Sequence, residues 1–213
     1  MIRVKICGVI DEATAQAAAE AGADAIGLVF APSRRRVAPD QARRIAAALP
    51  PFVTKVGVFV NAPLEEIRAL ADSVRLDAVQ LHGDETAADC AAVGALGLTV
   101  IKAIRVAGPV DPAGLRALPI SAILLDTYHP DHRGGTGEPF DRRWAAPVAA
   151  VMPVILSGGL TPENVAAAIE AVRPYGVDVS SGVETDGRKD PAKMRAFVAA
   201  ARAAAAGLEG ARR

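Results

Sequence analysis

The chain has 213 residues, and its 24 basic and 24 acidic side chains give a formal net charge of zero. Hydrophobic residues make up 51% of the chain and aromatic residues only 4%. The balanced charge argues against a protein that coats nucleic acid or a membrane surface, the apolar fraction excludes a disordered chain, and few aromatic rings are available for stacking on bases.

Eight short apolar runs, rich in Val, Ile and Leu, alternate along the chain with longer alanine-rich amphipathic stretches. Such runs are typical of strands that are buried on both faces of a parallel sheet. The predicted strands are Val4–Cys7, Ala25–Phe30, Lys55–Val60, Ala78–Leu81, Val100–Ala103, Ala122–Asp126, Val154–Ser157 and Val177–Ser180.

A helix is predicted after each strand, and several begin with a capping side chain or a proline at the first helical position, as at Pro39 and Pro191. The predicted helices are Glu12–Ala21, Pro39–Ala48, Leu64–Asp72, Glu85–Leu96, Pro112–Ala117, Arg142–Ala149, Pro162–Val172 and Pro191–Ala206.

Eight consecutive strand–helix units predict an α/β protein with one domain, a (β/α)8 TIM barrel over residues 1–206, followed by a frayed tail over residues 207–213. An open doubly wound sheet is the alternative, but it usually has fewer strands. Neither nucleotide-binding fingerprint of such sheets, GxGxxG or GxxxxGK[ST], occurs. We therefore favour the barrel.

The N-terminal segment carries Arg3 and Lys5 and has no long apolar stretch, so we expect a first strand and no signal peptide. Uncharged runs fall short of the ~18 residues of a membrane span. Cys7 and Cys90 lie far apart, so neither a disulfide framework nor a cysteine metal site is expected. We predict a cytoplasmic protein without a metal, and the loop histidines His129 and His132 do not change this.

Polar residues interrupt the apolar pattern at the ends of several strands, where the chemistry of a (β/α)8 barrel lies. Alternation puts Lys5 and Cys7 on one face of the first strand, and a lysine inside a barrel is costly unless it is paired or used. Gln80 and His82 alternate in the same way, and Asp126 follows three aliphatic residues.

Each of these side chains also has a structural interpretation. Cys7 can be a small buried hydrophobe, Asp126 a helix cap or half of an ion pair, and His82 a polar residue with a structural partner. Cys90, among alanines in a predicted helix, is expected to pack without reacting.

Three arginines, Arg34, Arg35 and Arg36, follow the second predicted strand. Such a run is usually a solvated loop. Because this loop leaves a barrel strand, one of the arginines can instead hold a carboxylate by two parallel hydrogen bonds.

Two turns of small residues follow the last two predicted strands. Glycine lets backbone amides approach a ligand without interference from a Cβ atom, and the loops after the seventh and eighth strands commonly form the phosphate site of this fold. Either turn alone can be a tight connection without a ligand, but together they favour a phosphate site made of Ser157, Gly158, Gly159, Ser180, Ser181 and Gly182.

In combination, these residues resemble the phosphoribosylanthranilate isomerase family along essentially the whole chain. The matching segments are KICG (5–8), GLVF (27–30), the Ser-x-Arg loop (33–35), VGVFVN (56–61), VQLHGDE (79–85), LLDT (124–127), GGTG (134–137), FD (140–141), LSGGLTPENV (156–165) and DVSSGVE (178–184). KICG, QLHG and DVSSGVE in this order are highly specific.

The resemblance implies an Amadori rearrangement in tryptophan biosynthesis, which converts N-(5-phosphoribosyl)anthranilate to 1-(2-carboxyphenylamino)-1-deoxyribulose 5-phosphate without a cofactor or metal. It implies that Cys7 is the general base and Asp126 the general acid. This chemistry needs a raised pKa for Asp126 and a lowered pKa for Cys7, and Lys5 is the expected source of the second shift.

The resemblance also assigns residues that bind the substrate. Arg35 is the expected partner of the anthranilate carboxylate, with Arg36 as the alternative because the loop is one residue shorter than usual. Two departures, Ile10 where a polar residue is usual and the insertion Arg142-Arg143, concern only the substrate loops. The other expected substrate-binding residues are Lys5, Gln80, His82 and Asp178.

Three other functions remain open. The isomerase of histidine biosynthesis, or a dual-substrate version, would have an aspartate at the position of Cys7. A Schiff-base aldolase would use Lys5 or Lys102. A non-catalytic phosphate-binding barrel would tolerate loss of Cys7 and Asp126. The expected partner is a small phosphorylated substrate, without nucleic acid or membrane, and the chain is expected to be a monomer or a homodimer.

Overall fold

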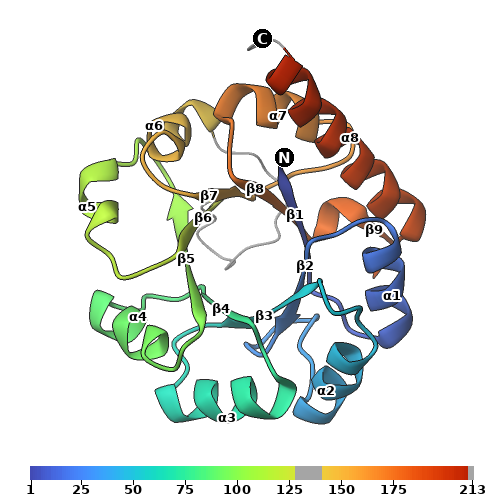
Figure 1. Ribbon diagram of the computed structural model, residues 1–213, viewed down its shortest axis with the longest axis vertical. Helices are drawn as coiled ribbons and strands as arrows, with labels where there is room; N and C mark the ends of the chain where they lie inside the picture. The colour runs from blue at the N-terminus through green and yellow to red at the C-terminus, as the bar shows by residue number, and fades with distance from the viewer. Residues whose placement is uncertain (128–140, 211–213) are drawn as a thin grey trace.

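Eight parallel strands close into a barrel in the computed structural model, which describes residues 1–127 and 141–210 (Figure 1). Each strand pairs with the next along the chain, and β8 returns to pair with β1. This confirms the predicted (β/α)8 barrel. The strands are β1 (Arg3–Cys7), β2 (Ala25–Val29), β3 (Thr54–Phe59), β4 (Ala78–Leu81), β5 (Thr99–Val106), β6 (Ala122–Thr127), β7 (Val154–Leu156) and β8 (Gly176–Val179).

The helices form a ring around the barrel (Figure 1). They are α1 (Glu12–Glu20), α2 (Pro39–Ala47), α3 (Leu64–Val74), α4 (Ala87–Gly94), α5 (Pro112–Arg116), α6 (Ala146–Ala149), α7 (Val165–Val172) and α8 (Pro191–Gly210). Two 3₁₀ turns, η1 (Arg142–Trp144) and η2 (Ser181–Val183), precede α6 and follow β8.

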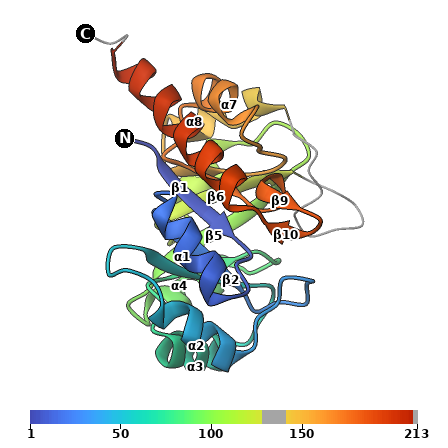
Figure 2. The same ribbon diagram turned by 90° about the vertical axis from the view of Figure 1, so that its right-hand side faces the viewer.

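A two-stranded antiparallel hairpin between β8 and α8 was not predicted. It consists of β9 (Glu184–Thr185) and β10 (Arg188–Lys189). Figure 2 shows the hairpin at the end of the barrel toward which β1 runs. This extra element therefore lies beside the carboxyl ends of the strands.

Buried aliphatic side chains fill two layers. The larger layer lies between the sheet and the helices and includes Ile6, Ile26 and Phe197. The smaller layer is the interior of the barrel, where short side chains such as Ala78, Ala103 and Ala122 share the space with a few larger aliphatic groups. Small residues let eight strands close tightly, so the barrel interior is a packed core and not a channel.

The limits of three helices differ from the predictions by three residues or more. α6 begins at Ala146 instead of Arg142, because residues Arg142–Trp144 form the 3₁₀ turn η1. α7 begins at Val165, three residues after the expected Pro162. The side chain of Asn164 accepts a hydrogen bond from the Thr161 amide and donates one to the Gly159 carbonyl, so this segment braces the preceding loop instead of starting the helix. α8 continues four residues beyond Ala206 to Gly210.

At the other end of the barrel the terminal ammonium of Met1 lies 2.7 Å from Oε1 of Glu209, near the end of α8. Among the described residues, no helix combines the length and apolar character needed to cross a membrane. His129, His132, Phe140 and the GGTG segment lie outside the described residues.

Candidate active site

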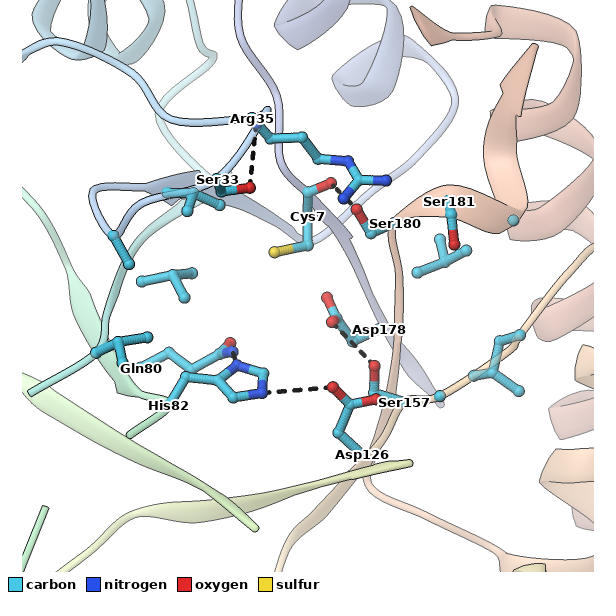
Figure 3. Close-up of a pocket in the computed structure, with 18 of the residues that line it drawn as sticks. Cys7, Ser33, Arg35, Gln80, His82, Asp126, Ser157, Asp178, Ser180 and Ser181 are labelled. Atoms are coloured by element: carbon cyan, nitrogen blue, oxygen red, sulfur yellow. Dashed lines mark hydrogen bonds and ion pairs between the residues drawn. The ribbon is translucent and has the colours of Figure 1, made fainter. Parts of the chain in front are cut away.

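A cavity of about 300 Å³ lies at the carboxyl ends of the barrel strands (Figure 3). Both residues of the expected acid–base pair line it, on opposite sides, and all six residues of the expected phosphate site line it as well. Lys5 and Arg36 are the expected site residues that do not line the cavity; those that do are Cys7, Arg35, Gln80, His82, Asp126, Ser157, Gly158, Gly159, Asp178, Ser180, Ser181 and Gly182.

Cys7 is the last residue of β1, and its thiol points into the cavity (Figure 3). The neighbouring residue on β2 is Gly27, and a Cβ atom there would lie 2.7 Å from Sγ of Cys7. The glycine therefore makes room for the thiol. Burial raises the pKa of Cys7 above its usual value, although the positive charges of Lys5 and Lys189 oppose this rise. The predicted lowering of this pKa is thus wrong.

Lys5 lies one layer below Cys7 and is 4% exposed. The register of β1 and β8 sets it opposite Asp178, and its ammonium donates a hydrogen bond of 2.8 Å to Oδ1 of that residue. Burial alone would lower the pKa of Lys5, but Asp178 and Cys7 raise it above its usual value. Ser157 donates to the other oxygen of Asp178, at 3.3 Å. Lys5 is therefore a charged residue of the barrel interior that supports the cavity floor.

His82 and Gln80 form a pair beside Asp126. Nε2 of Gln80 lies 2.8 Å from Nδ1 of His82, and as an amide nitrogen it donates that hydrogen bond. Nδ1 is then the acceptor, so the proton of the neutral ring is on Nε2, which lies 3.4 Å from Oδ2 of Asp126. Among the described residues, neither that Nε2 nor Oε1 of Gln80 has a hydrogen-bond partner. Oε1 of Gln80 is therefore available to a ligand, whereas Nε2 of His82 faces the Asp126 carboxylate.

The two glycine-rich loops pack against each other. Gly158 and Gly159 have φ angles of 82° and 62°, a conformation that favours glycine. A Cβ atom on Gly158 would collide with Thr127 at the end of β6, and one on Gly182 would collide with the carbonyl oxygen of Leu160. The loops after β7 and β8 thus fit together only because these positions lack side chains.

The arginine loop after β2 places two of its arginines very differently. The Arg35 side chain, 14% exposed, passes over Gly8 and reaches Glu184 at the start of β9. Arg36 is exposed outside the cavity, and its backbone bridges to Val29. Of the two candidates for a carboxylate partner, only Arg35 is in the cavity.

Sequence reasoning gave no role to Glu184 or Lys189. Nε and Nη2 of Arg35 donate to the two carboxylate oxygens of Glu184 at 2.7 and 3.0 Å, and the Lys189 ammonium lies 2.8 Å from Oε1. Burial would raise the pKa of Glu184, but Arg35 and Lys189 lower it to about 2. Glu184 closes the DVSSGVE segment, which was the only signal in the sequence that could have pointed to it.

The lysines do not suit a Schiff-base aldolase. The Lys102 ammonium donates to the carbonyl groups of Leu81, Gly83 and Ala103 and lies 3.0 Å from Oε2 of Glu85. Lys5 is paired with Asp178. A Schiff-base nucleophile must be neutral and free to reach a carbonyl group, so the aldolase interpretation is disfavoured.

Over residues 1–127 and 141–210, no group of three or more His, Cys, Asp or Glu side chains is arranged to hold a metal ion. The chemistry available in the cavity is that of a thiol, a carboxyl group, an imidazole and a guanidinium group, next to a loop pair suited to phosphate. This combination fits proton transfer on a phosphorylated substrate.

Comparisons with known proteins agree on one family. The family model for N-(5′-phosphoribosyl)anthranilate (PRA) isomerase matches residues 4–200. An N-(5′-phosphoribosyl)anthranilate isomerase from Pseudomonas fluorescens is 56% identical over 206 residues, which are 94% of this chain and 96% of that protein. One from Desulforudis audaxviator is 50% identical over 210 residues, 96% and 100% of the two chains.

Solved structures of phosphoribosyl anthranilate isomerases share the fold. That from Thermus thermophilus has a TM-score of 0.87, with 44% identity over 95% of this chain and 99% of the other. A complex with reduced 1-(o-carboxyphenylamino)-1-deoxyribulose 5-phosphate has a TM-score of 0.82, with 44% identity over 95% and 100%. Monomers generated from the dimeric Thermotoga maritima enzyme have a TM-score of 0.84, with 42% identity over 95% of this chain and 100% of the other.

Proposed function

This chain belongs to the N-(5′-phosphoribosyl)anthranilate isomerase family, and from that membership we propose a role for each group in its cavity. The enzyme catalyses the Amadori rearrangement of N-(5′-phosphoribosyl)anthranilate to 1-(2-carboxyphenylamino)-1-deoxyribulose 5-phosphate, a step of tryptophan biosynthesis. One observation carries the assignment of roles. Cys7 and Asp126 face each other across a cavity that has the glycine-rich loops on one side and Arg35 at its rim (Figure 3).

Asp126 is the general acid. It delivers a proton to the furanose ring oxygen, the C1–O bond breaks, and the nitrogen lone pair forms an iminium ion at C1. The carboxylate left behind lies next to the Nε2–H of His82, which stabilises the negative charge. The Thr127 amide donates to the other carboxylate oxygen at 2.9 Å.

Cys7 is the general base. The iminium ion acidifies the proton on C2, and the Cys7 thiolate removes it to give an enolamine, which tautomerises to the ketone. Burial raises the pKa of the free thiol, so the thiolate must be favoured by charges that act on it in the complex. Lys5 is one such charge, and the iminium ion formed in the first step is another.

The remaining cavity residues hold the two ends of the substrate. The loop pair of Gly158 and Ser180 offers backbone amides to the phosphate, and Arg35 offers the unused edge of its guanidinium group to the anthranilate carboxylate. Oε1 of Gln80, which has no partner among the described residues, accepts from a hydroxyl or amine group of the substrate. Lys5 and Asp178 act from below by fixing the floor of the cavity.

The acid–base pair is tested by Cys7→Ser and Asp126→Asn. Each variant is expected to lower kcat by at least ~10²-fold, since each removes a group that transfers a proton in the reaction. The assay is product formation from N-(5′-phosphoribosyl)anthranilate, with circular dichroism to show that the fold is kept. Near-normal turnover in either variant would overturn its assigned role.

Complementation tests the same assignment in cells. A bacterium that lacks this isomerase should grow without tryptophan when it carries the wild-type chain and should fail to grow with Cys7→Ser. If the wild-type chain does not restore growth, the activity assigned to the chain is wrong. Because the phosphate of the substrate prevents free passage through a membrane, we place the enzyme in the cytoplasm, where a fusion to a fluorescent protein should locate it.

We also propose that two copies of the chain associate through the amino-terminal end of the barrel. Phe52, 98% exposed, and Tyr175, 54% exposed, both lie there. They border a hollow of about 530 Å³ that is lined mostly by apolar residues such as Val56 and Ile155, with Arg3 and Asp24 also in its wall. A face that carries both a projecting aromatic ring and an apolar hollow can pair with itself around a two-fold axis.

A further inference from the structure

Glu184 on β9 and Lys189 on β10 are opposite each other in the hairpin, and their side chains form an ion pair behind the phosphate loop. The side chains are 6% and 2% exposed. All three N–H groups of the Lys189 ammonium have an acceptor: Oε1 of Glu184 at 2.8 Å, the Ser180 carbonyl at 2.9 Å and the Ser180 hydroxyl at 3.1 Å. Lys189 is therefore fully occupied by the protein and has no proton left for a substrate.

Hydrogen bonds connect this pair to both ends of the cavity. The Ser180 hydroxyl, which accepts from Lys189, donates to the backbone carbonyl of Cys7 at 3.1 Å. On the other side, Glu184 receives the two hydrogen bonds from Arg35. One buried pair thus contacts the phosphate loop and the carboxylate-binding arginine directly, and it reaches the backbone carbonyl of the base through the Ser180 hydroxyl.

A buried ion pair is weak evidence for stability, because the cost of desolvating both charges can exceed their attraction. Burial lowers the pKa of Lys189, and the Glu184 carboxylate counteracts this. Glu184 also pairs with Arg34 and Arg35, so the cluster carries more positive than negative charge. An excess of positive charge beside a thiol and a phosphate site favours the thiolate and a bound phosphate. We therefore attribute this cluster to the reaction and not to the stability of the fold.

We propose that Lys189, held by Glu184, is a further positioning residue of this enzyme, which fixes the Ser180 loop against Cys7 and adds a second buried positive charge beside the thiol. The inference rests on the function proposed above, since it takes Cys7 as the base. The property of Cys7 that it concerns is the pH dependence of the reactivity of the thiol, which can be measured without turnover.

Charged groups on several elements around Cys7 act on its thiol. Lys5 on β1 and Lys189 on β10 lower the pKa of the thiol, whereas its burial and Asp178 on β8 raise it. The other charged or titratable groups that face the cavity are Arg35 on the loop after β2, His82 after β4 and Asp126 on β6. Lys189 is the only one of the two lysines that also contacts the phosphate loop.

The test measures the alkylation of Cys7 by iodoacetamide between pH 6 and pH 10. Cys90→Ala is the background, so that one thiol reacts; Cys90 is buried in α4, away from the cavity. Lys189→Met should move the profile to higher pH, which makes alkylation at pH 8 about three- to tenfold slower, because thiolate is the reacting form. Lys189→Gln, which keeps a hydrogen-bond donor without the charge, should move the alkylation profile by the same amount as Lys189→Met.

Lys189→Arg should restore a profile close to that of the background protein, because it returns the charge. The matched control is Lys193→Met. Lys193 lies close by at the start of α8, and its ammonium donates to the backbone carbonyl of Glu184 and not to the carboxylate, so its loss should leave the profile unchanged.

A profile of Lys189→Gln that coincides with the background protein, in a variant folded by circular dichroism, would overturn the proposal. A shift of the same size in Lys193→Met would also overturn it, because the effect would then be one of overall charge. Turnover of the wild-type chain decides the proposed function separately, so the failure of one can be told from the failure of the other. In urea all variants should share one profile.

Discussion

At the scale of single residues, the neighbouring arginines Arg35 and Arg36 differ in where their side chains lie. Arg35→Ala should raise KM by about 10- to 100-fold, the range expected for loss of a charge-assisted contact to a carboxylate. Arg36→Ala should leave KM within about twofold of the wild-type value, because its side chain is outside the cavity. Steady-state kinetics of the two variants side by side checks this. A larger effect in Arg36→Ala would exchange their roles.

The pH dependence of stability provides a test of Glu184. Its pKa in the folded protein is about 2, below the 4.5 of a free glutamate. A lowered pKa stabilises the folded state fully above the unfolded value, and this contribution is lost as the pH falls from about 4.5 through about 2. The free energy of unfolding of the wild-type chain should therefore exceed that of Glu184→Gln near pH 6, and the difference should shrink towards pH 2.

Urea unfolding at several pH values measures this difference. Glu170→Gln, an exposed substitution on α7, is the control and should show little dependence on pH relative to the wild-type chain. If the difference in the free energy of unfolding between the wild-type chain and Glu184→Gln stays constant from pH 6 to pH 2, the Glu184 carboxylate is not ionised through its contacts with Arg35 and Lys189.

Residue types and spacing made Cys7 and Asp126 candidate site residues, because a polar side chain at the end of an apolar strand can be read directly from the sequence. Their roles as base and acid were implied only by the resemblance to the isomerase family. The direction of the Cys7 pKa could not be read in this way. It depends on the balance between burial, Lys5, Asp178 and Lys189, and only the structure shows how deeply the thiol is buried. The partners of Glu184 were equally hidden, since Arg35 is 149 residues away along the chain.

At the scale of elements, the loops after β7 and β8 must fit together for the proposed phosphate site to form. Gly182→Ala would place a Cβ atom on the carbonyl oxygen of Leu160, so the two loops would have to move apart. We expect KM to rise about tenfold or more, with a smaller change in kcat, because the loops bind the substrate and do not transfer protons. Gly108→Ala is the matched control, since a Cβ atom there meets nothing within 4 Å.

Kinetics and thermal unfolding of the two glycine variants distinguish a local effect from a general one. A KM that stays at the wild-type value in Gly182→Ala would show that this loop does not hold the phosphate. Equal changes in the two variants would show that loss of a glycine, and not loss of the contact between the loops, is responsible.

Strands were predicted to within a few residues, because burial on both faces gives them an apolar pattern with clear limits. The entry to α7 was predicted less well. Thr161-Pro162 has the composition of a helix start, but Asn164 uses its side chain to hold Gly159, so the helix begins later. The β9–β10 hairpin was missed altogether, because two-residue strands have too short a pattern to be recognised.

At the scale of the whole molecule, closure of the barrel followed from counting eight strand–helix units in a chain with no room for long insertions. Which face of the barrel meets a second copy does not follow from such a count. The sequence places Phe52 in a loop, but only the structure shows that it is exposed and next to a hollow at the end opposite to the active site.

The proposed association of two chains can therefore be tested separately from catalysis. Phe52→Asp should convert a dimer into a monomer, because it removes the projecting ring and replaces it with a carboxylate that loses its hydration on entering a mostly apolar hollow. Light scattering after gel filtration gives the mass directly, with Glu66→Lys on the outer face of α3 as a control that should remain a dimer. Since Phe52 lies at the opposite end from Cys7 and Asp126, kcat should stay within about twofold of the wild-type value in the monomer. A wild-type chain that is monomeric at micromolar concentration, or a Phe52→Asp variant that remains dimeric, would rule out this face as the interface.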